Sequence, residues 1–242
     1  MNDRSNEALI RECKAKAAEA AADLVVDGAV VGLGSGSTLA IAIKHLAQRC
    51  REGLRITAAA SSLQARLLAV ELGIPMLEIM DVSRVDVTLD GADEIDEAGN
   101  LIKGGGAAHT TEKVLAAMAD RFVVVVDQSK CVQRLGSQFP VPIEVVVPAL
   151  ASVRRRLEAL GARVVLRTGS GKIGPVISDL GHPILDAQFG PIADPAELDR
   201  RLSSIPGIVG HGLFIGMADH AIIGAVENNR PTIHERQLTR FR

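Results

Sequence analysis

Four acidic residues fall within seven positions in the run DGADEID, which extends from Asp90 to Asp96. Crowded carboxylates raise one another's pKa, so one of them can hold a proton and act as an acid. Oxygen-rich clusters also bind Mg²⁺ or Ca²⁺, although this spacing is not that of an EF-hand loop. Asp90 and Asp93 lie closest to the apolar strand expected at 86–89. We expect Glu94 and Asp96 to lie in a solvated turn.

A second candidate segment is the run GLGSGST at residues 32–38, which follows an apolar stretch and opens a helical pattern. Glycines let backbone N–H groups approach an anion closely, and a helix N-terminus favours negative charge. Ser35, Ser37 and Thr38 add hydroxyl donors. The run lacks the lysine of a Walker A motif and the spacing of G-x-G-x-x-G. It is therefore either a phosphate cradle or a tight turn with Thr38 as helix N-cap.

Lys103 precedes three consecutive glycines, and Glu112 falls in the first turn of the helix expected after them. Three glycines are costly to order, which indicates backbone that approaches a ligand or moves. Lys103 can neutralise an oxyanion or a phosphate. Glu112 is either a base or a carboxylate that only complements the helix dipole. Lys130, in the run DQSK at another strand end, is a weaker candidate for phosphate binding.

The composition excludes several classes of function. The 242-residue chain is 47% hydrophobic and carries a net charge of -2, so no basic field attracts nucleic acid or an anionic membrane. With five Phe and no Trp or Tyr, stacking on single-stranded nucleic acid is disfavoured. The three cysteines and six histidines show no metal or disulfide spacing. We found no apolar run of membrane-spanning length and no signal peptide, so we expect a cytoplasmic protein.

The first half of the chain alternates between helical and strand patterns. Strands are expected at 29–33, 56–60, 86–89 and 122–126, with helices at 10–27, 38–50, 63–72 and 111–119. Nearly continuous apolar strands separated by helices predict an α/β fold, a Rossmann-like parallel sheet covered on both faces. Ligands bind at the carboxyl ends of such strands. The polar segments after Leu33, Leu89 and Val126 should therefore converge.

The second half predicts a smaller α+β domain. Strands are expected at 143–147, 163–166, 176–178, 183–185 and 208–209 and helices at 148–160 and 195–203. With one short strand in excess, this order matches the β-α-β-β-α-β of a ferredoxin-like module. We assign residues 138–210 to this domain, and residues 1–137 plus 211–242 to the main domain. Strands near 213–215 and 221–223 should rejoin the main sheet. The polar tail from Asn228 is expected to be loose.

Six runs, in this order, resemble type A ribose-5-phosphate isomerases. They are GLGSGST at 32–38, DGADEID at 90–96, LIKGGGAA with TEK at 101–113, DQSK at 127–130, FPVPIEVVVP at 139–148 and SIPGIVGHGLF at 204–214. The resemblance covers nearly the whole chain. DGADE together with IKGGGAA is highly specific, whereas the GSGST loop is shared by a wider superfamily.

The resemblance implies a metal-free, cofactor-free isomerase of the non-oxidative pentose phosphate pathway, which interconverts D-ribose 5-phosphate and D-ribulose 5-phosphate through a cis-enediolate. Glu112 aligns with the catalytic base, Asp90 and Asp93 with active-site acids, and Lys103 with the active-site lysine. The substrate-binding positions that it implies are Ser35, Gly36, Ser37, Thr38, Asp90, Gly91, Ala92, Asp93, Lys103, Gly104, Gly105, Gly106 and Lys130. It further implies a homodimer or homotetramer.

Some positions depart from the family pattern. His109 and Thr111 stand where a Leu and an Arg are common, and the turn at 179–182 replaces a DNGN-like sequence. Two alternatives stay open: a related sugar-phosphate isomerase, deaminase or lactonase of the same superfamily and, given His109 and Thr111, a non-catalytic sugar-phosphate-binding protein. A sugar-phosphate sensor of a transcriptional regulator is disfavoured, because the roughly 28 residues before the first strand are too few for a helix-turn-helix.

Overall fold

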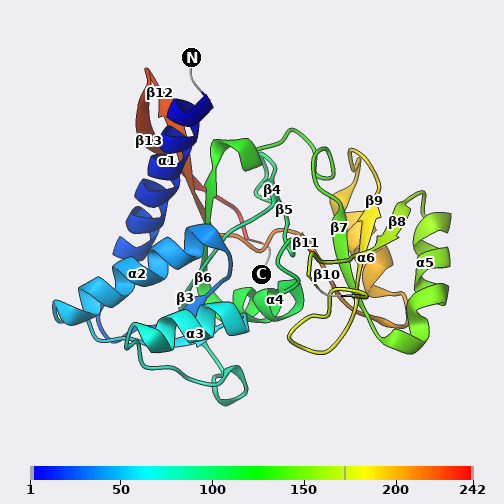
Figure 1. Cartoon of the computed structure of the whole chain (residues 1–242), viewed down its shortest axis with the longest axis horizontal. Coiled ribbons are helices and arrows are strands. Elements are labelled where there is room, and N and C mark those ends of the chain that lie inside the picture. The colour runs from blue at the N-terminus through cyan, green and yellow to red at the C-terminus, as the bar shows by residue number, and fades with distance from the viewer. Residues whose placement is uncertain (1–2, 172, 241–242) are drawn as a thin grey trace. The chain divides into compact units, whose positions relative to one another are not determined.

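A computed structural model describes residues 3–171 and 173–240 of the chain, which forms two compact units. The first unit comprises Met1–Gly91, Val114–Lys130 and Met217–Arg242, and the second comprises Ala92–Lys113 and Cys131–Gly216. Both are drawn in Figure 1. The second unit contains the expected small domain, 138–210, and also residues that we assigned to the main domain. Among the described residues, no helix is long and apolar enough to cross a membrane.

The first unit is built on a six-stranded sheet with the order β13-β12-β6-β3-β1-β2. Its strands are β1 (Val30–Leu33), β2 (Thr57–Ala60), β3 (Val85–Asp90), β6 (Ala119–Asp127), β12 (His220–Glu227) and β13 (Arg230–Gln237). Every neighbouring pair is parallel except β12 and β13. The near-continuous burial of β3, β6 and β12 is what a sheet covered on both faces requires.

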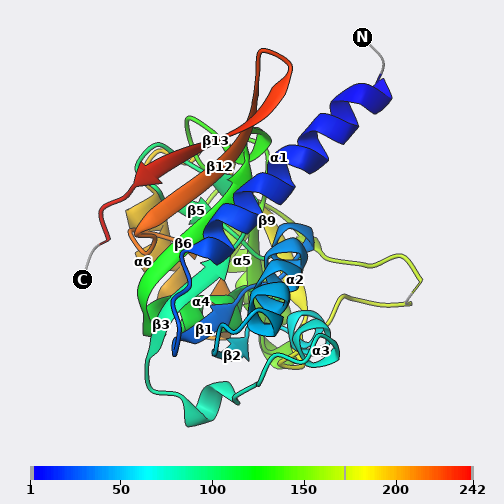
Figure 2. The ribbon, with the colours of Figure 1, turned by 90° about the vertical axis from the view of Figure 1, so that its left-hand side faces the viewer.

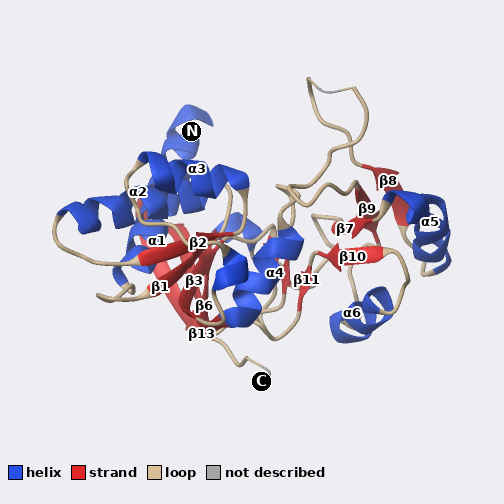
Figure 3. Ribbon diagram, turned by 90° about the horizontal axis from the view of Figure 1, so that it is seen from below, coloured by secondary structure: helices blue, strands red, loops and turns tan. Residues whose placement is uncertain are grey.

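Helices cover both faces of this sheet. They are α1 (Asp3–Asp23), α2 (Ser37–Arg51), α3 (Leu63–Glu71) and α4 (His109–Met118). One core cluster joins apolar residues of α1, α2 and α3 to alternate residues of β1, β3 and β6. Leu115 of α4 packs against Ala59 and Val85 in a separate cluster. The first three helices therefore lie on one face and α4 on the other (Figure 3), and α1 runs alongside the β12–β13 hairpin (Figure 2).

Two expectations for the C-terminal part are wrong. The polar tail is not loose: β13 pairs with β12 along its whole length, through a turn at Asn228 and Asn229, both with positive φ. An edge strand with one exposed side carries charged residues, so it lacks the apolar pattern of a buried strand. The strand near 213–215 does not join the main sheet. It is β11 (Leu213–Phe214), which pairs with β5 (Leu101–Ile102), itself paired with β4 (Glu94–Ile95).

The second unit contains the expected ferredoxin-like module. Its elements are β7 (Val141–Val145), α5 (Leu150–Ala159), β8 (Arg163–Leu166), β9 (Ile184–Gln188), α6 (Pro195–Ser203) and β10 (Ile208–His211). The antiparallel sheet has the order β10-β7-β9-β8. Both helices pack on the face that carries Val141, Ile143 and Leu185. The strand expected at 176–178 is wrong, because that segment makes only isolated bridges.

The remaining elements are short. They are the 3-10 turns η1 (Ile79–Asp81), η2 (Gln128–Lys130) and η3 (Val147–Ala149). The second of them follows β6 directly and carries Lys130, one of the predicted site residues. It therefore places that lysine at the carboxyl end of a central strand of the first unit.

Candidate active site

The three polar segments expected to converge do lie at one edge of the first unit's sheet. Strands β1, β3 and β6 are parallel neighbours, so their carboxyl ends share an edge. The segment Gly34–Thr38 follows β1, Asp90 ends β3, and Lys130 follows β6. This edge is where ligands bind in open α/β sheets.

Gly34 and Asp90 are in close contact at this edge. A Cβ atom on Gly34 would lie 2.0 Å from Oδ1 of Asp90, a distance that no real side chain allows. The buried Asp90 carboxylate accepts hydrogen bonds through Oδ1 from the amides of Gly91 (2.7 Å) and Ser35 (3.3 Å). The glycine is therefore required for the aspartate to reach the turn, and the aspartate in turn orients the Ser35 amide.

Helix α2 begins without a side-chain cap. Its N-cap residue is Gly36, which has a φ of 93° and makes no side-chain capping bond, so the alternative of Thr38 as N-cap is wrong. The Gly36 amide donates to Oε1 of Gln64 (3.1 Å). Ser37 is exposed and Ser35 and Thr38 are half-buried. The start of α2 is thus at least partly exposed from Ser35 to Thr38, and backbone amides and hydroxyl groups are the donors that a phosphate group needs.

In the second unit, Lys103 and Glu112 form a buried ion pair. Nζ of Lys103 lies 3.2 Å from Oε2 of Glu112, and the side chains are only 3% and 5% exposed. The lysine ammonium also lies 5.6 Å from the ring centre of Phe214. Removing either partner would leave the other charge buried beside an apolar ring, so the pair is costly to break. A dipole-complementing surface carboxylate would not be buried in this way, which argues against that interpretation of Glu112.

Asp93 lies against the three glycines. Its Oδ2 accepts a hydrogen bond from the Gly105 amide (2.8 Å), and its own amide donates to the carbonyl of Ile102 (2.8 Å). Gly104, with a φ of 105°, packs directly on the imidazole of His109. The second unit therefore brings Asp93, the glycine loop, Lys103 and Glu112 together through α4 and the short β4–β5 pair.

Burial lowers the pKa of two histidines and one lysine beside this cluster. It lowers the pKa of His109 to about 3, with Lys113 and Arg167 adding to the effect. It likewise lowers the pKa of His211 to about 3 and that of Lys113 to about 8. Nζ of Lys113 lies 3.5 Å from Nδ1 of His211. Both histidines are therefore neutral near pH 7 and do not compete with Lys103 for negative charge.

The expectation of a solvated turn is wrong for Glu94. Its side chain is fully buried and accepts hydrogen bonds from the amides of Gly136 (2.5 Å), Gln138 (2.5 Å) and Phe139 (2.7 Å). It holds the loop that leads into β7. Asp96 closes a local turn by accepting from the amide of Asn100 (2.8 Å). Two of the four clustered acids are therefore structural.

Two groups that support the cluster, Arg167 and Glu144, are not among the residues predicted from the sequence. Arg167 donates to the carbonyls of Gly104 (2.7 Å) and Gly105 (3.1 Å) and is itself held by Asp186. Buried Glu144 of β7 accepts from hydroxyl groups of Thr110 and Ser178. No local motif marks these residues, because their partners lie between 19 and 63 positions away in the chain.

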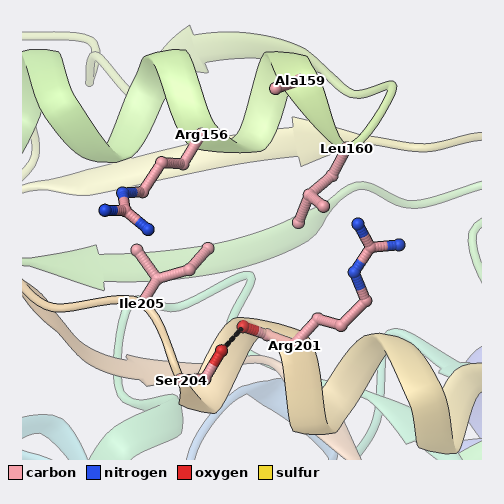
Figure 4. Close-up of a pocket in the computed structure, with 6 residues that line it drawn as sticks. All are labelled: Arg156, Ala159, Leu160, Arg201, Ser204 and Ile205. Atoms are coloured by element: carbon pink, nitrogen blue, oxygen red, sulfur yellow. Dashed lines mark hydrogen bonds between the residues drawn. The ribbon is translucent and has the colours of Figure 1, made fainter.

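The cavity shown in Figure 4 is a different feature of the second unit. It has a volume of about 300 Å³ and lies between α5 and α6, where it is lined by Arg156, Ala159, Leu160, Arg201, Ser204 and Ile205. It contains none of the predicted site residues and no carboxylate or imidazole that could act as a base. Chemistry therefore favours the Lys103–Glu112 cluster as the candidate active site.

No three His, Cys, Asp or Glu side chains gather into a possible metal site within the described part of the chain. The clustered acids instead take separate partners: Asp90 accepts from backbone amides in the first unit, and Asp93 and Glu94 do so in the second. The absence of a metal in the reaction stays a prediction.

Known proteins resemble this chain over nearly its whole length. The family model for ribose 5-phosphate isomerase A (phosphoriboisomerase A) matches residues 57–228. Ribose-5-phosphate isomerase A of Thermosynechococcus vestitus is 49% identical, covering 93% of this chain and 97% of the relative. The solved ribose 5-phosphate isomerase A of Methanocaldococcus jannaschii is 40% identical with a TM-score of 0.87, covering 93% of this chain and 99% of that one. A D-ribose-5-phosphate isomerase solved in complex with phospho-erythronic acid is also 40% identical, with a TM-score of 0.89 and coverage of 94% and 99%.

Proposed function

The chain belongs to the ribose 5-phosphate isomerase A family, and on this premise we propose that it interconverts D-ribose 5-phosphate and D-ribulose 5-phosphate with Glu112 as the base. The observation that carries the role of Glu112 is its buried ion pair with Lys103. Phospho-erythronic acid, with which a relative was solved in complex, carries a planar carboxylate with two oxygens, and an enediolate also carries two oxygens in one plane. A phosphorylated sugar acid is thus a stable mimic of the intermediate that this reaction requires.

The proposed reaction moves one proton between adjacent carbons. Glu112 takes the proton from C2 of the open-chain aldose, the electron pair forms the C1–C2 double bond, and negative charge develops on O1. The protonated Glu112 then returns the proton to C1, while the proton of the O2 hydroxyl passes to O1, so that O2 becomes the ketose carbonyl and O1 a hydroxyl. The same carboxylate serves the reverse direction, so one base is sufficient.

We propose that Lys103 and the glycine loop stabilise the enediolate. The Lys103 ammonium is within reach of the base, so it lies where charge develops when the proton is taken. The Gly105 amide is bonded to Asp93 in this structure, so the Gly104 and Gly106 amides are the ones that we assign to the oxyanion. Preorganised donors of this kind usually supply the largest share of such catalysis.

We assign the binding of the phosphate group and the opening of the sugar ring to the remaining predicted residues. The uncapped first turn of α2, with Ser35–Thr38, is suited to the phosphate, and Lys130 adds a positive charge at the same sheet edge. The acids expected to help open the furanose are Asp90 and Asp93. Asp93 is half-buried and Asp90 fully buried, which favours Asp93 for direct contact with the sugar and Asp90 for orienting Ser35. We include Gly91 and Ala92, which join these acids, in the binding segment.

Substitution of the base tests the function. Glu112→Gln keeps the shape of the side chain but cannot accept the proton, so we expect kcat to fall on the order of 1,000-fold while the protein stays folded. The matched control is Glu97→Gln, an exposed glutamate of the same unit, which should leave kcat unchanged. Turnover is measured with ribose 5-phosphate by the appearance of the ketose. Near-normal turnover in Glu112→Gln would remove Glu112 from its role.

We also propose that the chain works in the cytoplasm, without metal or cofactor, as a homodimer or homotetramer. Leu63, Leu67 and Val70 of α3 support the oligomer, because they are between 55% and 59% exposed at helical spacing and form an apolar stripe of the kind that interfaces cover. Light scattering should give the mass of two or four 25.5 kDa chains, and Leu67→Asp should lower it. A monomeric wild-type protein would contradict the proposal.

A further inference from the structure

Arg167 joins two parts of the second unit that are far apart in the sequence. It follows β8 and is 13% exposed. Its Nε donates to Oδ2 of Asp186 (2.9 Å) and its Nη2 to Oδ1 (2.5 Å). Its Nη1 donates to the carbonyls of Gly104 (2.7 Å) and Gly105 (3.1 Å). One guanidinium thus binds a carboxylate of β9 and two consecutive carbonyls of the glycine loop.

The planar shape of the guanidinium makes this arrangement directional. Asp186 occupies one edge of the fork in a bidentate pair, which fixes the plane of the group. With that plane fixed, Nη1 can point in only one direction, towards the loop. A lysine at this position could pair with Asp186 as a point charge, but it could not hold both carbonyls and the carboxylate in the same geometry.

Fixing the two carbonyls also fixes the amides on the far side of each peptide. The carbonyl of Gly104 and the amide of Gly105 belong to one planar trans peptide and point in opposite directions, as do the carbonyl of Gly105 and the amide of Gly106. The Gly105 amide meets Asp93 in this way. Arg167 therefore orients the Gly106 amide, which we assign to the oxyanion, through the peptide group and without touching the amide.

We propose that Arg167, oriented by Asp186, is a positioning residue for the isomerisation. It holds a loop of three glycines, which would otherwise sample many conformations, in the one that presents its amides to the enediolate. The inference rests on the proposed function of the loop. The competing explanation is that the Arg167–Asp186 pair only ties β8 to β9 and contributes to stability.

Substitution by lysine separates the two explanations. In Arg167→Lys the ion pair with Asp186 can persist and the carbonyl contacts are lost. We expect kcat to fall on the order of 100-fold, the loss typical of a small misplacement of catalytic groups, with KM within about threefold and the melting temperature nearly unchanged. Asp186→Asn, which keeps the arginine but loosens its orientation, should show a smaller loss of kcat. The control is Arg200→Met, which removes an exposed arginine paired with Glu197 in the same unit and should change neither parameter.

Amide hydrogen exchange of the ligand-free protein provides the second readout. Exchange at the Gly105 amide, which is bonded to Asp93, should accelerate in Arg167→Lys and not in Arg200→Met. Normal kcat in Arg167→Lys, unchanged exchange in the loop, or a loss of activity explained by the unfolded fraction alone would each overturn the positioning role. If the wild-type protein did not turn over ribose 5-phosphate, the proposed function would fail, and the exchange rates would still decide whether Arg167 holds the loop.

Discussion

The two glycine-rich segments of the protein are held in different ways. Each lies against an aspartate that accepts a backbone amide: Asp90 accepts from Ser35 and Asp93 from Gly105. The first segment is an extension of the sheet, because the Gly34 amide donates to the carbonyl of Leu89 on the neighbouring strand (2.8 Å). The Gly104–Gly106 loop instead depends on side chains from elsewhere in the chain. The comparison shows that similar glycine-rich runs can be ordered either by the backbone ladder or by tertiary contacts.

This difference determines how each segment can be disturbed. A segment that is hydrogen-bonded to a sheet moves only when the sheet is distorted. A substitution there therefore lowers the free energy of unfolding. A loop held by side chains can become mobile after one substitution while the fold persists. Such a substitution therefore lowers activity before it lowers stability.

The largest expected effect comes from breaking the charge pair beside the second segment. Lys103→Met leaves Glu112 buried without its ammonium, so we expect the free energy of unfolding to fall by about 3–5 kcal/mol and kcat to fall at least 100-fold. The double variant Lys103→Met/Glu112→Gln should recover most of the stability and none of the activity. Urea unfolding and kcat measurements on the three proteins check this. Equal stability of the single and double variants would show that the pair does not matter for folding.

A smaller effect on stability is expected when one glycine of each segment is replaced by alanine. In Gly34→Ala the new Cβ would lie 2.0 Å from the buried Asp90 carboxylate, whereas in Gly105→Ala it would lie 2.7 Å from the more exposed Asp93 carboxylate. Because Asp93 can move aside, we expect losses of unfolding free energy of about 3 kcal/mol and about 1 kcal/mol respectively. Gly106→Ala, which meets nothing within 4 Å, is the control. Similar losses at Gly34 and Gly105 would remove the distinction between the segments.

Acid should lower the free energy of unfolding through two buried histidines, one of which packs on the second segment. Burial lowers the pKa of His109 and His211 to about 3, so below pH 6.5 the unfolded chain binds protons that the folded chain does not. Stability is therefore complete above about pH 6.5 and is lost as the pH falls towards 3, by about 1.4 kcal/mol per pH unit for each histidine.

Urea midpoints between pH 6.5 and 5 measure this slope. His109→Leu, which replaces the imidazole that packs on Gly104, should remove the contribution of one histidine to this slope. An unaltered slope in His109→Leu would mean that this imidazole is protonated in the folded protein.

Much of the fold could be predicted because its signals are local. Apolar runs such as 122–126 and the glycine breaks after them mark strands and turns without reference to distant residues. Apart from the strand at 176–178 and Thr38 as N-cap, the expectations that proved wrong concern β13, β11 and Glu94. The two strands are polar or only two residues long, and the burial of a glutamate depends on amides more than 40 positions away.

The sequence by itself determined the order of the elements, the glycine turns at strand ends and the candidate residues Glu112, Lys103, Asp90 and Asp93. These follow from periodicity, turn chemistry and motif, which are properties of neighbouring residues. Only the tertiary structure decided that Lys103 pairs with Glu112, that Glu94 is structural, and that Arg167 holds the glycine loop. Burial and pairing are set by groups that meet only when the chain has folded, so no local pattern encodes them.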